Sequence, residues 1–485
     1  MMTDFEAPVS RSGKIGFGAL EYQADGAVEP NLYQLEGSRD KGWHVTRNEE
    51  PLLSFGPGYV LLRARSCGVC STDLARKFLP FPLPQIIGHE VLAVDQEGNR
   101  FVTEINASHR ALGQDLECPY CDNGLHTHCP QRKVLGIHDL PGGFGPFFLA
   151  PERGVFKVPP KITDATAVLM EPFAAALHAA DTVLPRIETS VAVLGTRRLG
   201  LLTVAARAAR RRQHGLSFRL IGLSRHQDLQ EVARAMGADE ASPPLEGRPR
   251  GTIADIVIDT TGSPEGLELA IALAHKEVHL KSTHGQRAAG LDHLTEAVVD
   301  EIELGHFHPT KQNNPSALAF GNAPRPLVLW QSEKPMPGWL EASCDWVRKQ
   351  EPDPARMALA EKRPELPAAD LVVVDQARGV DQALRPWADQ EQGLVRARGR
   401  IEVAQASASD GPLLQALTQR DLELSTSRCG DFKEALKLLE SDPDLSAQLP
   451  QLITHRLPAE QLGEAFEIAQ GPDCIKVVVE HGLAE

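Results

Sequence analysis

The middle of the chain alternates short apolar runs with amphipathic stretches. Residues 190–195, 218–224 and 254–259 are apolar runs of the length of a strand. Residues 199–212 and 229–236 lie between these runs and carry apolar side chains at helical spacing. Strands that alternate with helices predict a parallel sheet with right-handed crossovers, an arrangement that binds nucleotides.

Residues 15–160 show a different pattern, in which short strand-like segments are separated by many Gly and Pro residues. The segment 60–66 predicts a strand that leads into Cys70, and 91–95 predicts another strand. Residues 163–184 are rich in Ala and have helical spacing, which predicts a helix pair connecting two domains. A β-rich domain is therefore expected before the nucleotide-binding sheet.

The stretch 305–420 has the composition of a folded segment. Residues 326–330 and 369–375 predict strands, and 340–349 predict a helix. The segments rich in Pro and charge predict loops, at 305–326 and 350–368.

Two of the predicted strands begin alike. Ala-Asp-Ile-Val-Ile-Asp at 254–259 is echoed by Ala-Asp-Leu-Val-Val-Val-Asp at 369–375, and each is followed by a helix-like stretch and another strand. We hypothesise a partial duplication of a β-α-β unit. The alternative is two unrelated strands that begin alike, and a structure without matching β-α-β units would support it.

Composition limits the classes of function. The 485 residues suggest two or three domains, and 42% hydrophobic with 24% charged residues is typical of a soluble globular protein. A formal net charge of −15 argues against nucleic acid as a partner. The basic run 207–212 is interpreted as the solvated end of a helix, with a phosphate contact as the alternative.

No membrane association is expected, because the sequence has no run of 18 apolar residues. No signal peptide is visible at the N-terminus, so a cytoplasmic location is expected. The eight cysteines include a cluster at short spacing, a pattern that favours metal binding over disulfides in that compartment.

Two short motifs contain potential zinc ligands. Cys67-Gly-Val-Cys70-Ser-Thr72-Asp73 is followed by Gly-His89-Glu90. Zinc binds thiolate, imidazole and carboxylate, and a catalytic zinc keeps one position open. A Cys and a His alone are more typical of a buried thiol and a core histidine, so the flanking residues decide the interpretation.

These motifs, together with Met170-Glu171-Pro172 and Leu177-His-Ala179, resemble the metal-ligand motifs of the zinc-containing medium-chain dehydrogenases and reductases, which include alcohol, polyol and threonine dehydrogenases. The resemblance covers roughly residues 15–305 and 420–482. It implies an α/β protein with a β-rich, GroES-like partial-barrel catalytic domain, a Rossmann domain with a doubly wound parallel sheet, and an inserted α/β segment.

The expected domain boundaries follow from this resemblance. They are 1–165 with part of 425–485 for the catalytic domain, 166–304 with part of 420–455 for the Rossmann domain, and 305–420 for the insertion.

The resemblance also implies a catalytic zinc. Cys70 and His89 would be its ligands, Glu171 would be the third ligand, directly or through water, and Glu90 would lie in or beside the coordination shell. Thr72 would carry the proton of the alcohol away. Ala75 stands where many family members have a His that continues this relay. Cys67 is interpreted as a packed neighbour.

A second zinc is expected in a lobe with the spacing C-x2-C-x7-C, where the family has a fourth cysteine three residues upstream. The expected ligands are Asp115, Cys118, Cys121 and Cys129. The alternatives are a lobe that has lost its metal, or ligation by His126 or His128.

The cofactor turn departs from the dinucleotide fingerprint. Gly195-Thr-Arg197-Arg-Leu-Gly200 follows a predicted strand, but Arg197 replaces the middle glycine of G-x-G-x-x-G. Its guanidinium is able to contact a phosphate. Ser224-Arg225 ends the second strand without a carboxylate for the ribose hydroxyl, which favours NADP(H) over NAD(H). The expected cofactor-binding residues are Gly195, Thr196, Arg197, Leu199, Gly200, Ser224, Arg225, Thr260, Thr261 and Ser282.

The predicted function is reversible, zinc-dependent hydride transfer between NADP(H) and an alcohol, polyol, sugar or related hydroxy or carbonyl compound. A small-molecule substrate and a homodimer or homotetramer are expected. The alternatives are a zinc-independent reductase, or a non-catalytic binding or assembly protein that uses the segment 305–420. His306-Phe-His308 is interpreted as a solvated pair, with metal binding as the alternative.

Overall fold

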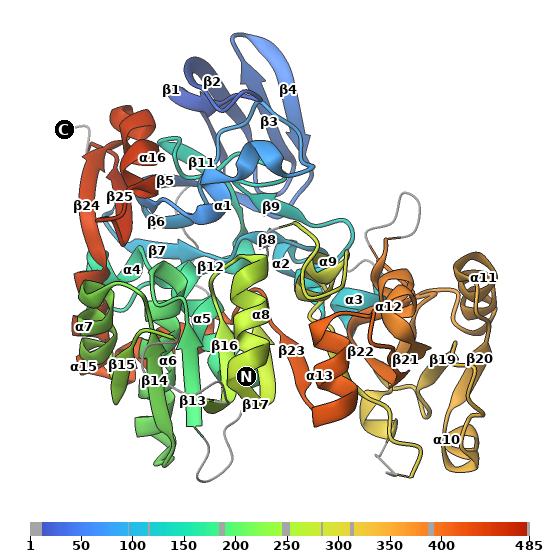
Figure 1. The fold of residues 1–485 in the computed structure, drawn as a ribbon. Helices are drawn as coiled ribbons and strands as arrows, with labels where there is room; N and C mark the ends of the chain where they lie inside the picture. Colours follow the sequence, from blue (N-terminus) through green and yellow to red (C-terminus); the bar gives the residue numbers. More distant parts are fainter. Residues whose placement is uncertain are drawn as a thin grey trace. The chain divides into compact units, whose positions relative to one another are not determined.

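The computed structural model describes residues 12–95, 97–114, 117–183, 190–244, 253–282, 285–310, 315–386 and 392–482 (Figure 1). The chain divides into two compact units. The first unit is Met1–Ala174 with Gly430–Glu485, and the second unit is Ala175–Cys429. The second unit therefore contains the segment 305–420 together with the nucleotide-binding sheet.

The first unit is built around mainly antiparallel sheets, in which only the pairs β9–β10 and β24–β25 of the described residues are parallel. A four-stranded sheet consists of β1 (Ser12–Tyr22), β2 (Val28–Ser38), β3 (Gly42–Arg47) and β4 (Glu50–Phe55). The central sheet has the order β12 (Val155–Lys157), β7 (Arg100–Thr103), β6 (Glu90–Val94), β5 (Tyr59–Gly68), β25 (Lys476–Glu480) and β24 (Ile453–Pro458), and β11 (Phe147–Pro151) also pairs with β5. A small sheet contains β10 (Asp139–Leu140), β9 (Lys133–Leu135) and β8 (Asn106–Ala107).

The helices of the first unit are mostly short. They are α1 (Ser71–Leu74), α2 (His109–Leu112), α3 (Pro119–Asp122), α4 (Asp164–Ala167), α14 (Phe432–Ser441), α15 (Pro443–Gln448) and α16 (Leu462–Gln470). The longer α5 (Met170–Thr182) runs across the division between the units.

Strand pairing in the central sheet determines which loops meet. The end of β5 pairs with the start of β6, so that Gly68 lies opposite Glu90. On its other side, Gly68 pairs with Val478 of β25. The loop after β5, the start of β6 and the start of β25 are therefore adjacent, although β25 is more than 380 residues away in the sequence.

The second unit contains one sheet of eleven strands. The first half-sheet has the order β15 (Glu240–Ser242), β14 (Arg219–Leu223), β13 (Ser190–Leu194), β16 (Ala254–Asp259) and β17 (Ala274–Leu280). The second half-sheet has the order β22 (Val395–Gln405), β21 (Ala369–Asp375), β19 (Leu327–Trp330) and β20 (Asp345–Arg348). Between them lie β23 (Glu423–Thr426) and β18 (Glu303–His306).

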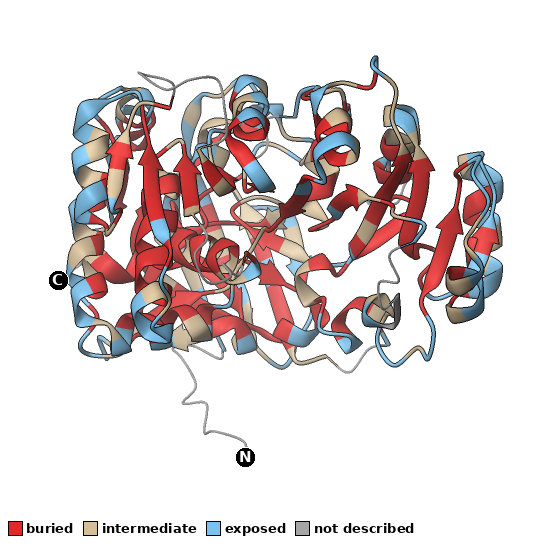
Figure 2. Cartoon of the chain, turned by 60° about the horizontal axis from the view of Figure 1, so that its bottom comes forward, coloured by how far each residue is buried: buried red, intermediate tan, exposed pale blue. Residues whose placement is uncertain are grey.

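Apart from the edge strands β15 and β20, most residues of the strands of this sheet are buried (Figure 2), as expected for a largely parallel sheet covered on both faces. The covering helices are α6 (Arg198–His214), α7 (Gln227–Ala235), α8 (Pro264–Leu273), α9 (Leu294–Val299), α10 (Gly338–Ser343), α11 (Pro352–Lys362), α12 (Gln376–Leu384) and α13 (Pro412–Arg420). One apolar core extends through both half-sheets, since it includes Val257 of β16 and Val372 of β21. The expected Rossmann-type sheet is confirmed.

The two half-sheets have the same strand order. The order β14-β13-β16-β17 is matched by β20-β19-β21-β22, and β16-α8-β17 corresponds to β21-α12-β22. The matching β-α-β units required by the duplication hypothesis are therefore present, and they extend further along the chain than the sequence echo indicated.

The last strands of the two half-sheets are exchanged. The chain leaves β17 through α9 and enters β18, which pairs in parallel with β22 of the second half-sheet. It leaves β22 through α13 and enters β23, which pairs in parallel with β17 of the first half-sheet. The two exchanged strands meet in an antiparallel bridge between Leu304 and Leu424. The segment 305–420 is therefore interwoven with the sheet and not an appended insertion.

Two predictions for this segment are wrong. The helix predicted at 340–349 ends at Ser343, and residues 345–348 form strand β20. The loop predicted at 350–368 contains helix α11. Its prolines occupy the first turn, where a residue without an N–H breaks no helical hydrogen bond.

The interpretation of 207–212 as a solvated run is also wrong in part. Arg207 is buried in α6, where its Nη1 donates to the Ala180 carbonyl at 2.9 Å. Burial lowers the pKa of Arg207 to about 10. Arg210 is also buried and forms an ion pair of 2.7 Å with Asp181. These cations attach α6 to the end of α5.

Candidate active site and metal-binding clusters

A thiol, an imidazole and a carboxylate converge at the end of β5. Cys70 precedes the short helix α1, and its backbone N–H donates to Asp73 Oδ2 at 2.8 Å. The pairing of β5 with β6 brings His89 and Glu90 to the same place. One ligand atom from each of Cys70, His89 and Glu90 lies within 4.8 Å of the other two. We call these three residues the catalytic cluster.

Two further residues orient the catalytic cluster. Asp73 is buried, and its Oδ1 lies 3.4 Å from Nδ1 of His89, which leaves Nε2 for a metal. Lys476 forms a buried ion pair with Glu90 and also donates to the Val69 carbonyl at 2.9 Å. Asp73 ends the motif that begins at Cys67, but the sequence alone does not indicate its contact with His89. Lys476 has no local signal, because only the pairing of β25 with β5 brings it close.

The remaining catalytic candidates are placed differently. The Thr72 hydroxyl lies 3.7 Å from the Cys70 sulfur, at the edge of the cluster. Glu171 is half-buried in the first turn of α5, and its carboxylate does not join the converging ligand atoms of the described residues. Ala75 caps the C-terminus of α1.

The donor set and its electrostatics fit a zinc ion. Burial alone would lower the pKa of His89, but Asp73 and Cys70 outweigh it and hold that pKa well above its usual range. A site that stabilises a buried positive charge favours a cation for the same reason. Burial raises the pKa of Cys67 well above its usual range, so this residue stays a packed thiol.

The cysteine lobe contains an unexpected histidine. His109, Cys118, Cys121 and Cys129 are all buried, and their ligand atoms lie within 4.8 Å of one another. Nδ1 of His109 lies 3.7 Å from the Cys129 sulfur, and its Nε2 is 2.9 Å from Gln131 Oε1. A Cys3His set with an oriented imidazole fits a structural zinc.

The other ligands considered for this lobe do not join the cluster. Asp115 lies outside the described residues. His126 instead pairs with Glu104 at 3.2 Å, and His128 contacts the Thr127 hydroxyl at 3.2 Å. The sequence did not indicate His109, because it precedes Asp115 and therefore lies outside the segment from Asp115 to Cys129 that contains the predicted ligands.

The turn between β13 and α6 has the close packing of a dinucleotide-binding turn. Gly195 has a φ of 88°, and a Cβ there would lie 2.9 Å from Thr261 Cγ2. A Cβ on Gly200 would lie 2.4 Å from the Gly195 carbonyl oxygen. Arg197 is half-buried at the N-cap of α6. The Thr196 hydroxyl is buried and has no hydrogen-bond partner among the described residues, which fits a phosphate at this helix N-terminus.

Several candidate cofactor residues support the turn through their side chains. Thr260 Oγ1 donates to the carbonyls of Leu194 and Gly195 at 2.9 and 3.0 Å. Thr261 donates its N–H and hydroxyl to Asp259 Oδ1 at 2.8 and 2.7 Å. Leu199 is half-buried in the first turn of α6.

The strand ends beside this turn carry the other candidates. Ser224 is buried after β14, and its hydroxyl accepts the His226 N–H at 3.2 Å. Arg225 is exposed next to it, and Ser282 is half-buried after β17. An exposed guanidinium at the end of the second strand is available to an anionic group.

A buried polar network joins β17 to the exchanged strand β23. The two ring nitrogens of His279 each lie 2.8 Å from a serine hydroxyl, on Ser425 and Ser427. Lys281 Nζ donates to the Ser427 hydroxyl at 3.1 Å and to the Arg428 carbonyl at 2.5 Å. Burial holds the pKa of His279 well below its usual range, so the ring is neutral. The carboxyl edge of the first half-sheet is thus completed by a strand from beyond residue 420.

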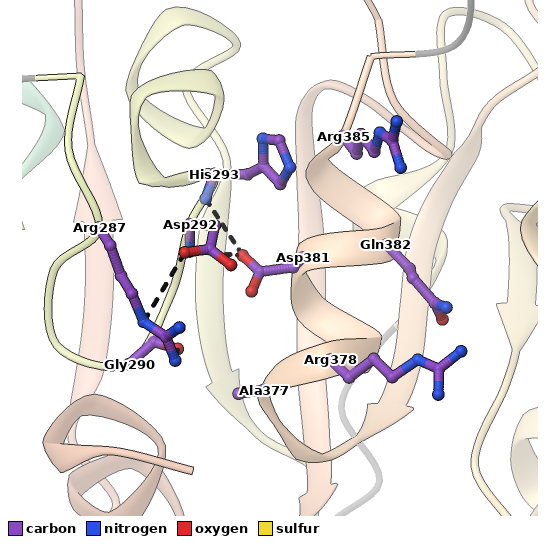
Figure 3. Close-up of a pocket in the computed structure, with 9 residues that line it drawn as sticks. All are labelled: Arg287, Gly290, Asp292, His293, Ala377, Arg378, Asp381, Gln382 and Arg385. Atoms are coloured by element: carbon purple, nitrogen blue, oxygen red, sulfur yellow. Dashed lines mark hydrogen bonds and ion pairs between the residues drawn. The ribbon is translucent and has the colours of Figure 1, made fainter.

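A hollow of about 460 Å³ lies between α12 and the loop before α9 (Figure 3). Asp381 Oδ1 accepts the backbone N–H groups of Asp292 and His293 at 2.9 and 3.1 Å. Arg287 lies 3.7 Å from the Asp292 carboxylate. The residues that line the hollow are Arg287, Gly290, Asp292, His293, Ala377, Arg378, Asp381, Gln382 and Arg385. None of them is a predicted site residue, and the hollow marks a junction between the two halves of the sheet.

The β-rich unit with its thiolate–imidazole–carboxylate cluster, and the Rossmann-type sheet with its glycine turn, define the class of zinc-containing dehydrogenases. Residues 56–160 match the alcohol dehydrogenase GroES-like domain. The L-threonine 3-dehydrogenase of Bacillus velezensis is 28% identical over 259 residues, which are 48% of this chain and 67% of that protein. The domain match, the relatives and the fold together support the medium-chain dehydrogenase/reductase family of oxidoreductases.

Solved structures share the fold at low sequence identity. The L-idonate 5-dehydrogenase of Escherichia coli aligns with a TM-score of 0.56 and 14% identity, covering 97% of this chain and 100% of that one. A Sinorhizobium meliloti protein described as a zinc-binding dehydrogenase, solved bound to NADP, aligns with a TM-score of 0.52 and 18% identity, covering 96% and 98%. Among the described residues, no helix has the length and apolar character needed to span a membrane.

Proposed function

We propose that the protein is a zinc-dependent oxidoreductase that transfers a hydride between NADP(H) and an alcohol, polyol, sugar or related hydroxy or carbonyl compound. The observation that carries this proposal is the convergence of Cys70, His89 and Glu90 within 4.8 Å, with the Thr72 hydroxyl at the edge of the cluster. Relatives named for threonine and sorbitol oxidation support this substrate class.

Each residue of the cluster has a role in the proposal. Zinc held by Cys70 and His89 would act as a Lewis acid on the substrate oxygen. Asp73 orients the imidazole of His89, and Lys476 holds the Glu90 carboxylate in place beside the metal. The Thr72 hydroxyl oxygen would accept the proton of the alcohol while the hydroxyl releases its own proton to water. Glu171 is retained as a ligand that acts through water.

NADP(H) is proposed over NAD(H) because an exposed Arg225 follows β14, where no carboxylate is available. The turn from Gly195 to Gly200 would hold the pyrophosphate, with Arg197 contacting a phosphate oxygen. The NADP bound to the Sinorhizobium meliloti neighbour supports a nicotinamide cofactor on this fold.

Fluorescence titration with NADPH and NADH tests the cofactor. The wild-type chain is expected to bind NADPH more tightly, because a cation faces the 2′-phosphate. Arg225→Ala is expected to weaken NADPH binding about tenfold, the loss of one charge-assisted contact, and to leave NADH unchanged. Arg219→Ala, at the opposite end of β14, is the matched control. Equal affinities of the wild type for both nucleotides would contradict the preference.

A panel of alcohols and aldehydes, assayed with NADPH or NADP, tests the chemistry. Cys70→Ser is expected to abolish turnover while NADPH binding remains, since the thiolate belongs to the metal cluster and not to the nucleotide turn. Undiminished turnover in this variant would instead support a zinc-independent reductase. Absence of nucleotide binding in the wild type would support a binding or assembly protein.

The remaining parts of the proposal concern assembly and location. We propose a homodimer or homotetramer, to be tested by light scattering on the full chain. A cytoplasmic location is proposed because four of the cysteines lie in the two metal-binding clusters, and a reducing compartment keeps such thiols from forming disulfides.

A further inference from the structure

A cluster of two imidazoles and a carboxylate lies in the second unit, where the exchanged strands cross. Nδ1 of His306 is 3.1 Å from Asp421 Oδ1, and Nε2 of His308 is 2.6 Å from the same oxygen. The two rings lie 4.2 Å apart between centroids. One ligand atom from each residue lies within 4.8 Å of the other two. We call these three residues the crossover cluster.

The backbone holds both imidazoles on one side. His306 ends β18, and the next N–H, that of Phe307, donates to the Val403 carbonyl of β22 at 3.0 Å. The Phe307 ring points the other way, into a small core where it packs edge-on against Trp330 at 5.2 Å. Residues two apart on an extended strand share a face, so His306 and His308 project together.

The carboxylate reaches the cluster from the second exchanged strand. Asp421 follows α13 in the left-handed conformation, with φ 54°, and the next N–H, that of Leu422, donates to the Ala416 carbonyl at 3.2 Å. Two residues further, Leu424 bridges to Leu304 of β18. The position of Asp421 is therefore fixed by a helix end on one side and a strand bridge on the other.

The charge around the cluster favours a cation. Arg400 contacts three carboxylates, Glu303 at 2.9 Å, Glu402 at 3.0 Å and Glu423 at 3.3 Å. Glu402 also interacts electrostatically with His308. One guanidinium thus faces three carboxylates before Asp421 is added, which leaves the neighbourhood with an excess of negative charge.

The donor chemistry selects the kind of ion. Two imidazoles with one carboxylate suit a first-row divalent ion such as zinc or cobalt. Such an ion has bonds of about 2.0–2.1 Å and holds neighbouring ligand atoms about 3 Å apart, and the two imidazole nitrogens lie 3.1 and 2.6 Å from Asp421 Oδ1. The side chains of His306, His308 and Asp421 are 22%, 29% and 58% exposed, so an ion and its completing waters have access.

We propose that His306, His308 and Asp421 bind a divalent zinc-type ion, with water completing its coordination. The ligands are 115 residues apart in the sequence. The ion therefore joins the two points at which the chain passes between the half-sheets. A link that closes a long loop stabilises the folded chain by restricting the unfolded one.

Titration of the chelator-treated full chain with Co²⁺ tests the proposal. Cobalt at the two cysteine-containing clusters gives a thiolate charge-transfer band, whereas cobalt at the crossover cluster gives visible ligand-field absorption without that band. The wild type is expected to bind one equivalent of this second kind. Absence of that equivalent in the wild type overturns the proposal, whatever the variants do.

Two variants locate the equivalent. Asp421→Asn keeps a residue that tolerates the left-handed conformation and removes the charge. The double variant His306→Gln/His308→Gln removes both imidazoles, and His275→Gln, an exposed histidine of β17, is the control. Both test variants are expected to bind the extra Co²⁺ at least tenfold more weakly. Unchanged stoichiometry and affinity in both would overturn the proposal.

Thermal unfolding separates a metal site from a hydrogen-bonded latch. Excess Zn²⁺ is expected to raise the unfolding temperature of the wild type more than that of Asp421→Asn. If the two proteins differ by the same amount in chelator and in Zn²⁺, the cluster acts only through hydrogen bonds and the proposal fails.

Discussion

Single side chains outside the metal ligands control the catalytic cluster. Asp73 lies 3.4 Å from Nδ1 of His89 and accepts the Cys70 N–H, so it positions two proposed ligands at once. An orienting carboxylate of this kind typically contributes 10- to 100-fold to metal affinity. Substitution of such a residue is therefore expected to reduce metal binding, as substitution of a ligand does.

Asp73→Asn is expected to weaken zinc binding about 10- to 100-fold, because the amide lacks the charge that supports the imidazole. Competition with a chromophoric chelator measures the change. NADPH affinity is the internal control, since the nucleotide turn lies in other elements. Zinc affinity equal to that of the wild type would show that Asp73 only caps α1.

His109 is expected to be a ligand of the structural zinc. His109→Ala is expected to lower the zinc content by one per chain, because three thiols remain and the imidazole is lost. His126→Ala is the matched control, since His126 lies in the same lobe but pairs with Glu104. Metal analysis after dialysis distinguishes the two variants. Equal zinc in both would favour a ligand other than His109.

Asp259 is expected to make the stability of the folded protein depend on pH. Burial raises its pKa from 3.8 to about 6, while one oxygen holds Thr261. The folded state therefore binds this proton more tightly than the unfolded state. Stability from this group is present below pH 4, falls as the pH rises to about 6 and is constant above that.

Asp259→Asn removes this pH dependence and keeps the acceptor for Thr261. A shift of two units corresponds to about 3 kcal/mol, so the variant is expected to be more stable at pH 7 by up to that amount. Denaturant unfolding at pH 4 and pH 7 measures the effect. A variant that is less stable at pH 7 would show that the carboxylate has an ionic partner in the protein.

At the scale of elements, the pattern of apolar residues predicted those strands and helices whose positions depend on neighbouring residues in the sequence. The largely apolar run 254–259 predicted a strand, and strand β16 covers the same residues. Helix α11 was missed because prolines in a first turn look like loop residues. Lys476 and Asp421 reach their sites through strand pairing between distant segments, which a single sequence does not encode locally.

The exchange of β18 and β23 has its own sequence trace. Two similar segments, Ile302-Glu-Leu304 and Leu422-Glu-Leu424, stand at the start of β18 and of β23. A chain that lacks residues 305–424, with Leu304 joined to Ser425, is therefore expected to keep the first half-sheet and NADPH binding. Its hybrid last strand is able to lie beside β17 and keeps Ser425 and Ser427.

The matched deletion removes 327–405, which takes the second half-sheet but leaves both last strands. One of these strands then has no parallel neighbour, so this chain is expected to aggregate or unfold. Circular dichroism and NADPH titration compare the two deletions. The same folding and the same NADPH binding in both deletion variants would contradict the prediction that the last strands are interchangeable.

At the scale of the whole molecule, the antiparallel bridge between Leu304 and Leu424 joins two similar half-sheets within one chain. Removal of residues 305–424 exposes the edge of the hybrid last strand. Two copies of that edge are complementary to each other, and the shortened chain is expected to dimerise through them. Light scattering over a concentration series measures this association, and a monomer at all concentrations would contradict it.

The exchanged strands also give the protein an order of assembly during synthesis. Translation must add 426 − 306 = 120 residues between the end of β18 and the end of β23. At 5–20 residues per second this takes about 6–24 s. Throughout that interval the nascent first half-sheet ends at β17, and β18 is the only last strand that the ribosome has delivered. A newly made chain must therefore keep this edge open, or release β18 from it, before the later strand arrives.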